Sequence, residues 1–290
     1  MTRLADIQRE QASMAELQDI VSAMRALAGM RLQEAQQALP AIRRYGEAMA
    51  HAISTAMQLM PASSSAHGPG RGSRALIVCC SEHGFVGGFN ERLIEAMESG
   101  LASDDRLFII GSRGVALAVE RGRTVSWSKA MATRVAGAPD LVHALAGELY
   151  GRIARGEIGS VDVLFERYEQ HDGPAVERRR LLPLDTRPVP RQPAQQAALH
   201  YLASPILVEK LVGEYVFALM TEAAVESIAS ENGARFSAMQ SAHDSVSKKQ
   251  VQLGRFAEEA RQSEITSELL DLITGAEALK ARGRSMPSGP

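Results

Sequence analysis

The last third of the chain carries one long helical pattern. Apolar side chains recur at steps of three and four from residue 206 to residue 286, and no proline interrupts this stretch. The positions on this stripe are Leu207, Leu211, Tyr215, Ala218, Val225, Ile228, Phe236, Met239, Val246, Val251, Leu253, Phe256, Ala260, Ile265, Leu269, Leu272 and Leu279. A helix of about 80 residues would reach about 120 Å, too far to bury its stripe against one small domain. We therefore expect it to pack against a second helix, against partner proteins, or against both.

The second helix is predicted at the other end of the chain. The same spacing of apolar residues runs over residues 4–57, and Pro40 is its only interruption before Pro61. A proline inside a helical pattern kinks or ends the helix. The stripes are mostly Met, Ala and Val, which is more typical of helices with several neighbours than of a self-sufficient coiled coil. Together they predict an antiparallel coiled coil of an N-terminal helix (1–60) and a C-terminal helix (200–282), with a domain inserted between them.

The inserted domain is predicted at residues 74–185, where strand and helix patterns alternate. Two segments whose composition is typical of linkers flank this domain. Residues 61–73 are rich in Ser, Gly and Pro, and residues 186–194 are rich in Pro. Residues 74–80 form a continuous apolar run, typical of a strand that is buried on both faces. Further strands are expected at 107–110, 124–127, 161–168 and 176–184, and helices at 91–97, 114–121 and 141–154. Such alternation predicts a small α/β layer domain.

Composition narrows the classes of partner and the location. The 290 residues carry a net charge of −2 and neither half is strongly basic, so we do not expect a nucleic-acid partner. No signal peptide is visible, and no apolar run approaches the roughly 18 residues of a membrane span. The two cysteines, Cys79 and Cys80, are adjacent inside an apolar run. We interpret them as reduced core thiols of a cytoplasmic protein.

A glycine-rich turn, residues 81–90, follows the first predicted strand and opens a helix. Glycines at such a place can let a phosphate approach a helix N-terminus. However, the spacing is not G-x-G-x-x-G, no GK[ST] follows, and no acid is well placed about 20 residues on. A tight turn or a protein contact is therefore favoured over a ligand site. The seven histidines show no metal-ligand spacing and no catalytic motif is present, so we expect no catalytic, cofactor or metal site.

Two features of the C-terminal stripe call for an explanation. Gly233, Gly254 and Gly275 lie inside the helical pattern, although each costs about 1 kcal/mol relative to alanine. Their presence indicates close neighbours or a need for curvature. Residues 260–270 place Arg, Gln, Thr and Glu beside apolar residues. From the residues alone, this segment is either an ordinary exposed face or a contact surface.

Three blocks of sequence resemble a known family, in the family's order and over nearly the full length. Residues 20–32 resemble its I-T-x-A-M-[KE] and A-A-S-K-[LM] segments, and residues 81–90 resemble S-D-R-G-L-C-G-G-L-N. Residues 229–236 resemble A-S-E-x-x-A-R-M, and the likeness continues through 260–269 to 275–279. On these blocks the chain resembles the gamma subunit of the F-type rotary ATP synthases.

The resemblance implies a fold, a role and a set of partners. The fold would be an antiparallel pair of long terminal helices with an inserted Rossmann-like α/β domain. The helix pair would stand inside a hexamer of alpha and beta subunits, and the α/β domain would rest on epsilon and on the ring of c subunits. Such a subunit couples ion flow to ATP synthesis or hydrolysis without catalysing, and does not act as a homo-oligomer. It would lie peripherally on the cytoplasmic side of a bacterial inner membrane.

The family's contact positions map onto this sequence as expectations. The contacts with beta would be Met24, Arg25, Arg235, Arg261, Gln262, Thr266 and Glu268. The contacts with epsilon and the c ring would be Gly84, Gly87, Gly88 and Asn90.

The chain also departs from the family pattern. Asp19 and Ser22 stand where lysine is often found, Glu82 and His83 replace Asp-Arg, Val86 replaces cysteine and Met30 replaces serine. The lower part of the helix pair is therefore less basic than in typical members, so their salt bridges do not all transfer. These differences suit the gamma subunit of a second, divergent bacterial F-type ATPase. Two other readings remain at this point, a Rossmann-type nucleotide-binding protein with helical extensions and a coiled-coil scaffold.

Overall fold

The computed structural model describes residues 3–57, 72–169, 173–184 and 202–284, which form two long helices, three shorter helices and one five-stranded sheet. The helices are α1 (Arg3–Met57), α2 (Phe89–Ser99), α3 (Ser112–Glu120), α4 (Ala138–Ala154) and α5 (Ser204–Arg284), and a short 3₁₀ turn, η2 (Val135–Gly137), precedes α4. The strands are β1 (Ser73–Cys79), β2 (Arg106–Ile110), β3 (Trp127–Lys129), β4 (Ile158–Arg167) and β5 (Ala175–Leu182). Most of the first predicted linker and all of the second lie outside the described residues.

Helix α1 does not end at Pro40, although the sequence predicted a kink or an end there. Pro40 is exposed, whereas the preceding Leu39 is 6% exposed and belongs to the core. The backbone carbonyl that loses its hydrogen-bond donor can therefore be hydrated, and packing on the opposite face keeps the helix continuous.

The described residues group into two compact units. One comprises residues 25–238, and the other comprises residues 1–24 together with 239–290. The first unit contains the whole sheet and the adjoining segments of both long helices, and the second contains the remaining segments of those helices. These two units do not test the predicted division of the chain into an N-terminal helix (1–60), an α/β domain (74–185) and a C-terminal helix (200–282), which stays a prediction.

The sheet has the strand order β3-β2-β1-β4-β5. Strands β1, β2, β3 and β4 are parallel, with Leu76 of β1 opposite Leu107 of β2 and Asp162 of β4. Strand β5 pairs antiparallel with β4 at one edge. The predicted double-sided burial of β1 is confirmed, because every residue from Ala75 to Cys79 is at most 2% exposed. Parallel strands joined by helices confirm the predicted α/β layer class.

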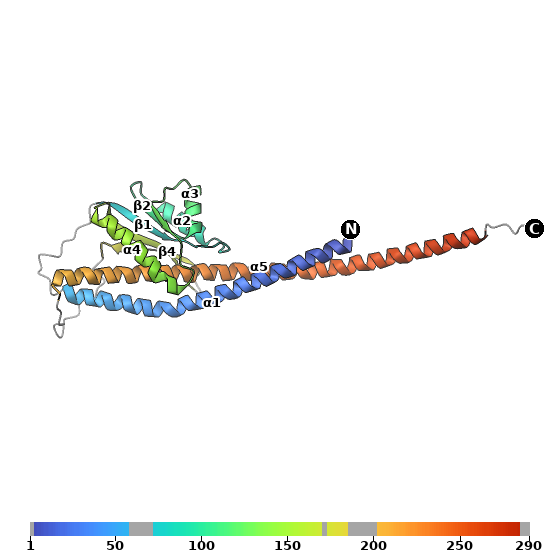
Figure 1. Cartoon of the computed structure of the whole chain (residues 1–290), viewed down its shortest axis with the longest axis horizontal. Coiled ribbons are helices and arrows are strands. Elements are labelled where there is room, and N and C mark those ends of the chain that lie inside the picture. The colour runs from blue at the N-terminus through green and yellow to red at the C-terminus, as the bar shows by residue number, and fades with distance from the viewer. Residues whose placement is uncertain (1–2, 58–71, 170–172, 185–201, 285–290) are drawn as a thin grey trace, which may run out of the picture. The chain divides into compact units, whose positions relative to one another are not determined.

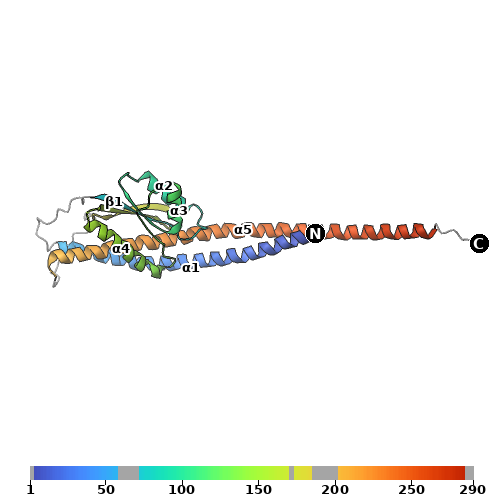
Figure 2. The same ribbon diagram turned by 45° about the horizontal axis from the view of Figure 1, so that its top comes forward.

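Helices cover both faces of the sheet (Figure 1), and each face has its own core of buried side chains. On one face, Leu76 and Val78 of β1 pack with α2 and α3. On the other face, Ile77 and Cys79 pack with α4 and with segments of α1 and α5, an arrangement that the turned view also shows (Figure 2). In this second core, Ala35 and Leu39 of α1 lie in one cluster with α5 residues from Val216 to Ala229. The long helices thus pack together here, as the pattern predicted.

The second unit consists of two antiparallel helix segments. Gln18 of α1 donates a hydrogen bond to Ser247 of α5 at 3.3 Å, and Lys249 lies 3.3 Å from Glu10. The buried apolar residues of this pair are Val21, Met239, Val246 and Leu253. Farther along α5, side chains of the predicted stripe are more than half exposed at Ile265, Leu269 and Leu272. A search of the described helices finds none that is both long and apolar enough to span a membrane.

Candidate functional site

The candidate site lies where α5 passes the carboxyl ends of β1 and β4. Every α5 residue from Met220 to Asn232 is buried, although this stretch contains three glutamates, two serines, a threonine and an asparagine. A buried polar group is costly unless it is hydrogen-bonded. The partners of these side chains therefore show how the helix is joined to the α/β layers.

The glycine-rich turn holds its own shape through Ser81 and Asn90. The Ser81 backbone N–H donates to Asn90 Oδ1 at 2.9 Å, and Asn90 Nδ2 donates to Ser81 Oγ at 2.8 Å. Between them the backbone enters the left-handed region at Phe85 (φ 61°) and Gly87 (φ 54°). The Phe85 side chain is 68% exposed. Because an aromatic residue rarely adopts this conformation, neighbouring contacts must hold it in place.

One of these contacts is made by Arg235 of α5. Its Nη2 donates to the carbonyl oxygens of His83 (3.2 Å) and Gly84 (3.3 Å), and its Nε also donates to Gly84 at 3.3 Å. Its remaining bonds go to Glu231 Oε1 at 2.7 Å and Asn232 Oδ1 at 3.3 Å. Arg235 is only 6% exposed, and all three guanidinium nitrogens have acceptors within the chain. Burial raises the pKa of Glu231, an effect that Arg235 and His83 oppose.

A second contact fixes the other side of the turn through Glu82. Its Oε2 accepts from the backbone N–H groups of Ser112 (3.1 Å) and Met131 (2.9 Å), and its Oε1 accepts from Ser112 Oγ at 2.6 Å. Burial acts to raise the pKa of Glu82, but these hydrogen bonds outweigh it and the pKa is lowered. Ser112 is the first residue of α3, so a carboxylate of the chain itself occupies the place where a helix N-terminus could accept a phosphate.

Beside the turn, α5 is joined directly to the strands. Ser227 Oγ donates to the Cys79 carbonyl at 2.8 Å, and Ser230 Oγ donates to Glu166 Oε1 at 2.7 Å. Glu166, which is fully buried in β4, also accepts two hydrogen bonds from Arg92 of α2, at 2.9 and 3.0 Å. One carboxylate therefore links α2, β4 and α5.

Gly233 completes this contact by allowing a close approach. A Cβ at this position would lie 2.4 Å from Cε2 of Tyr168, just beyond the end of β4. The predicted close neighbour is thus present at Gly233. At Gly254 and Gly275 a Cβ would meet nothing within 4 Å, so neither has a close neighbour.

A separate ionic cluster lies farther toward the N-terminal end of α5. Glu222 Oε1 accepts from Arg43 Nε of α1 at 3.2 Å, and its Oε2 accepts from Arg179 Nη1 of β5 at 2.8 Å. Glu226, 1% exposed, pairs with Arg43 as well. Burial raises the pKa of Glu226 although Arg43 lies beside it. This cluster ties α1, α5 and the edge strand together within the first unit.

The family model for ATP synthase matches residues 3–279 of the chain, which is nearly its full length. The chain belongs to the ATP synthase gamma-chain family. A gamma chain of Moorella thermoacetica is 29% identical over 293 residues, covering 97% of this chain and 100% of the relative. One from Anaeromyxobacter sp. strain Fw109-5 is 28% identical, with coverage of 97% and 100%. The family predicted from the three sequence blocks is therefore confirmed.

Chains in solved ATP synthase structures share the fold. A chain of the Euglena gracilis mitochondrial ATP synthase, from an OSCP/F1/c-ring structure, superposes with a TM-score of 0.63 at 11% identity, over 99% of this chain and 98% of that one. A chain of the Tetrahymena thermophila central stalk and c ring superposes with a TM-score of 0.54 at 16% identity, over 77% and 99%. At such identities the likeness concerns the fold alone.

Within this gamma chain, the residues predicted to contact beta lie in different surroundings. Met24 and Arg25 are half-buried on α1, and Arg235 is buried and bonded to the glycine-rich turn. Arg261, Gln262, Thr266 and Glu268 are all exposed on α5. Their roles as contacts stay predictions.

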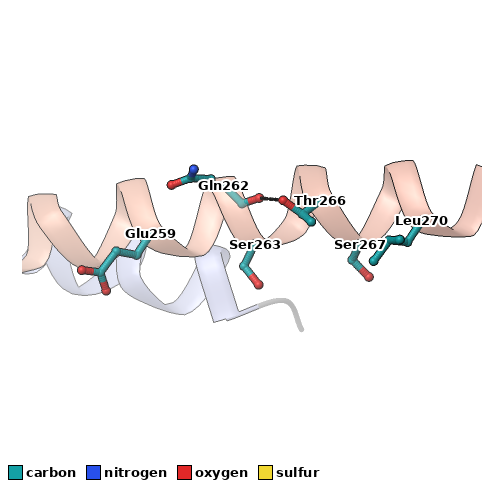
Figure 3. A pocket seen from close by; sticks show the side chains of 6 residues that line it. All are labelled: Glu259, Gln262, Ser263, Thr266, Ser267 and Leu270. Atoms are coloured by element: carbon teal, nitrogen blue, oxygen red, sulfur yellow. Dashed lines mark hydrogen bonds between the residues drawn. The ribbon is translucent and has the colours of Figure 1, made fainter.

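The exposed group includes a shallow depression on one helix. Its lining consists of Glu259, Gln262, Ser263, Thr266, Ser267 and Leu270, all from α5 (Figure 3). The Thr266 hydroxyl donates to the backbone carbonyl of Gln262 at 2.8 Å (Figure 3), a bond that does not involve the Gln262 side-chain amide. This surface offers hydrogen-bonding groups but no enclosed cavity. In the part of the chain that the structure describes, no group of three acidic, His or Cys side chains could hold a metal.

Sequence reasoning missed three carboxylates that bond to other parts of the chain: Glu82, which is half-buried, and Glu166 and Glu226, which are buried. A signal for two of them was present. Glu166 directly follows the apolar residues 163–165 of its strand, and Glu226 is followed by Ile228 within the apolar stripe of α5. Charges at such positions indicate buried pairs. Their bonding partners, however, are separated from them by 30 to 183 positions in the sequence, and no local pattern identifies them.

Proposed function

We propose that this chain is the central rotary stalk subunit that couples transmembrane ion flow to ATP synthesis or hydrolysis at alpha/beta catalytic sites, and that it is itself non-catalytic. The observation that carries the proposal is the match to the gamma-chain family over residues 3–279, which includes both long helices and the domain between them. Its partners are alpha and beta, epsilon and the c ring. It lies peripherally on the cytoplasmic side of a bacterial inner membrane.

The proposed contacts with beta use α1 and α5. Arg261, Gln262, Thr266 and Glu268 support this, because their side chains are exposed and lie on one continuous helix. Exposed polar contacts contribute only about 0–1 kcal/mol each, so a shaft can make and break them as it turns. Met24 and Arg25, both half-buried on α1, complete the proposed set. Arg235 was expected there too, but its guanidinium nitrogens all have acceptors within the chain.

The proposed contact with epsilon and the c ring uses the outer side of the glycine-rich turn. A Cβ at Gly84 or Gly87 would meet nothing within 4 Å, so a partner can approach the backbone there. Gly88 is also exposed, with Arg92 Nη1 3.3 Å from where its Cβ would be. Asn90 is 4% exposed, and its hydrogen bonds to Ser81 indicate that it supports this surface from inside.

Co-expression tests the proposal. The chain is produced with alpha, beta and epsilon from the same genome, and alpha with beta alone serves as the control. We expect a soluble complex that contains one copy of this chain and hydrolyses ATP faster than the control. A monodisperse chain with no affinity for alpha and beta would contradict the proposal.

A further inference from the structure

The side chain of Arg235 is buried and bonds to the glycine-rich turn. Its guanidinium group is directed at the glycine-rich turn and donates to two consecutive carbonyl groups, those of His83 and Gly84. These are the two residues immediately before Phe85, where the backbone enters the left-handed region. Arg235 therefore holds the chain at the point where the uncommon conformation begins.

The orientation of Arg235 is itself fixed. Glu231 lies one helical turn earlier on α5 and accepts from Arg235 Nη2 at 2.7 Å, while Asn232 accepts from Nη1 at 3.3 Å. The Glu231 and Arg235 side chains are only 8% and 7% exposed. A buried guanidinium group that donates to acceptors on both the turn and α5 has little freedom to turn toward another protein.

A second set of contacts also holds the turn. Glu82 is bound by the backbone of Ser112 and Met131, and Val86 is buried in the core next to α2. The segment between these anchors leaves Phe85 and Gly87 outside, and Phe85 is 68% exposed. Contacts on both flanks thus determine which backbone atoms and which aromatic ring the turn presents.

We propose that Arg235 is a positioning residue, which fixes the conformation of the glycine-rich turn and so the surface that the turn presents to a protein partner. This role acts through the turn and requires no direct contact of Arg235 with beta. The identity of that partner as epsilon or the c ring rests on the proposed function.

Limited proteolysis of the full chain tests the clamp without any partner. Chymotrypsin cuts after phenylalanine, and Phe85 is exposed but lies in a constrained turn, so cleavage reports local opening. We expect Arg235→Met to speed cleavage after Phe85 by about tenfold, because hydrogen bonds from a charged group are lost. Cleavage after Phe256, an exposed residue on the same helix, should not change and serves as the internal reference.

Two further variants sharpen the experiment. Arg44→Met is the matched control, because Arg44 is an exposed arginine of α1 and is distant in sequence from both cleavage sites, and it should leave cleavage after Phe85 unchanged. Arg235→Lys keeps the positive charge beside Glu231 but lacks the planar guanidinium group. We therefore expect the rate of cleavage after Phe85 to increase by about threefold. If Arg235→Met does not fold, Arg235→Lys decides the question. A folded Arg235 variant that is cut after Phe85 at the parent rate would overturn the proposal.

A binding measurement then separates this proposal from the function on which it depends. Arg235→Met complexes with alpha and beta should lose affinity for epsilon and the c ring by about tenfold while they retain alpha and beta. Unchanged affinity for epsilon and the c ring would overturn the proposed role in partner binding. If the parent chain binds neither epsilon nor the ring, the proposed function fails, and the proteolysis result still decides whether Arg235 clamps the turn.

Discussion

At the level of single residues, several buried polar groups of α5 have partners on other elements. Ser227 bonds to β1, Ser230 to a carboxylate of β4, and Arg235 to the turn after β1. A buried donor or acceptor left without a partner costs about 1–3 kcal/mol, so these bonds are made in one register of the helix and lost in others. The polar residues therefore specify how α5 is seated against the sheet, which apolar packing alone determines less sharply.

The two glycines of α5 at positions 233 and 254 should respond oppositely to alanine. Gly254→Ala should stabilise the chain by about 0.5–1 kcal/mol, because the site is open and alanine favours the helix. Gly233→Ala should destabilise it by about 1 kcal/mol or more, because Tyr168 must move. Denaturant unfolding of both variants beside the parent measures this. Equal stabilisation by the two substitutions would show that the Tyr168 contact is unimportant.

Glu82 should make stability depend on pH in a defined direction. Because its pKa is lower in the folded chain than its ordinary value of 4.5, its contribution is present above pH 4.5 and is lost as the pH falls through the folded pKa. We expect Glu82→Gln to cost about 1 kcal/mol at pH 7 and progressively less below pH 4.5.

The measurement is denaturant unfolding of parent and variant between pH 3 and pH 7. Glu120→Gln, at an exposed position at the end of α3, is the control and should have little effect at any pH. A cost of Glu82→Gln that stays constant down to pH 3 would contradict the account.

Gly87 should tolerate only residues that accept a left-handed backbone. At φ 54°, a β-branched residue costs about 1–3 kcal/mol, whereas asparagine adopts this region more readily. Gly87→Val should therefore impair assembly with epsilon and the c ring much more than Gly87→Asn. The measurement is recovery of both partners on an affinity-tagged complex. Equal losses would point to bulk at the surface instead of backbone strain.

At the level of elements, most of the fold followed from the spacing of apolar residues. The long helices were predicted from the helical period of 3.6, and β1 from a continuous apolar run that indicates burial on both faces. Short or polar segments were located less well. The predicted strand at 124–127 is found at Trp127–Lys129, where the apolar pattern is weak and pairing with β2 sets the position.

The candidate site could be predicted only in part. The glycine-rich turn and the 229–236 block were singled out by resemblance, but the contact between them depends on residues about 150 positions apart. No helical or strand period connects such residues. The polar residues of α5 are buried at 220–232 and mostly exposed at 261–268. This difference likewise cannot be predicted until the positions of the strands are known.

The exposed segment of α5 should matter for coupling more than for folding. Gln262 and Glu268 are exposed, and surface substitutions usually change stability by less than about 0.5 kcal/mol. We expect the double variant Gln262→Leu with Glu268→Lys to fold and assemble like the parent but to lower ATP turnover or ion pumping. Reconstituted complexes, with assembly checked on gels, provide the measurement. Full coupled activity would remove these residues from the mechanism.

At the level of the whole molecule, much apolar surface is left for partners. Along α5, Ile265, Leu269, Leu270, Leu272 and Ile273 are each at least half exposed. Contiguous exposed apolar surface of this kind marks an interaction site or leads to association. The alternative of a nucleotide-binding protein loses support, because the ATP synthase family model matches residues 3–279. A subunit whose helices are enclosed by partners accounts for both observations.

Rotation within the assembled complex is the direct test of whether this chain is a rotary coupling subunit. A bead is attached to a cysteine introduced by Val119→Cys, at a position of α3 that is 61% exposed, in a complex with immobilised alpha and beta. The native thiols should not react, because both are buried and burial raises the pKa of Cys79 to about 12. The account predicts rotation in one direction when ATP is added. A complex that hydrolyses ATP at full rate while the bead shows only random motion would contradict it.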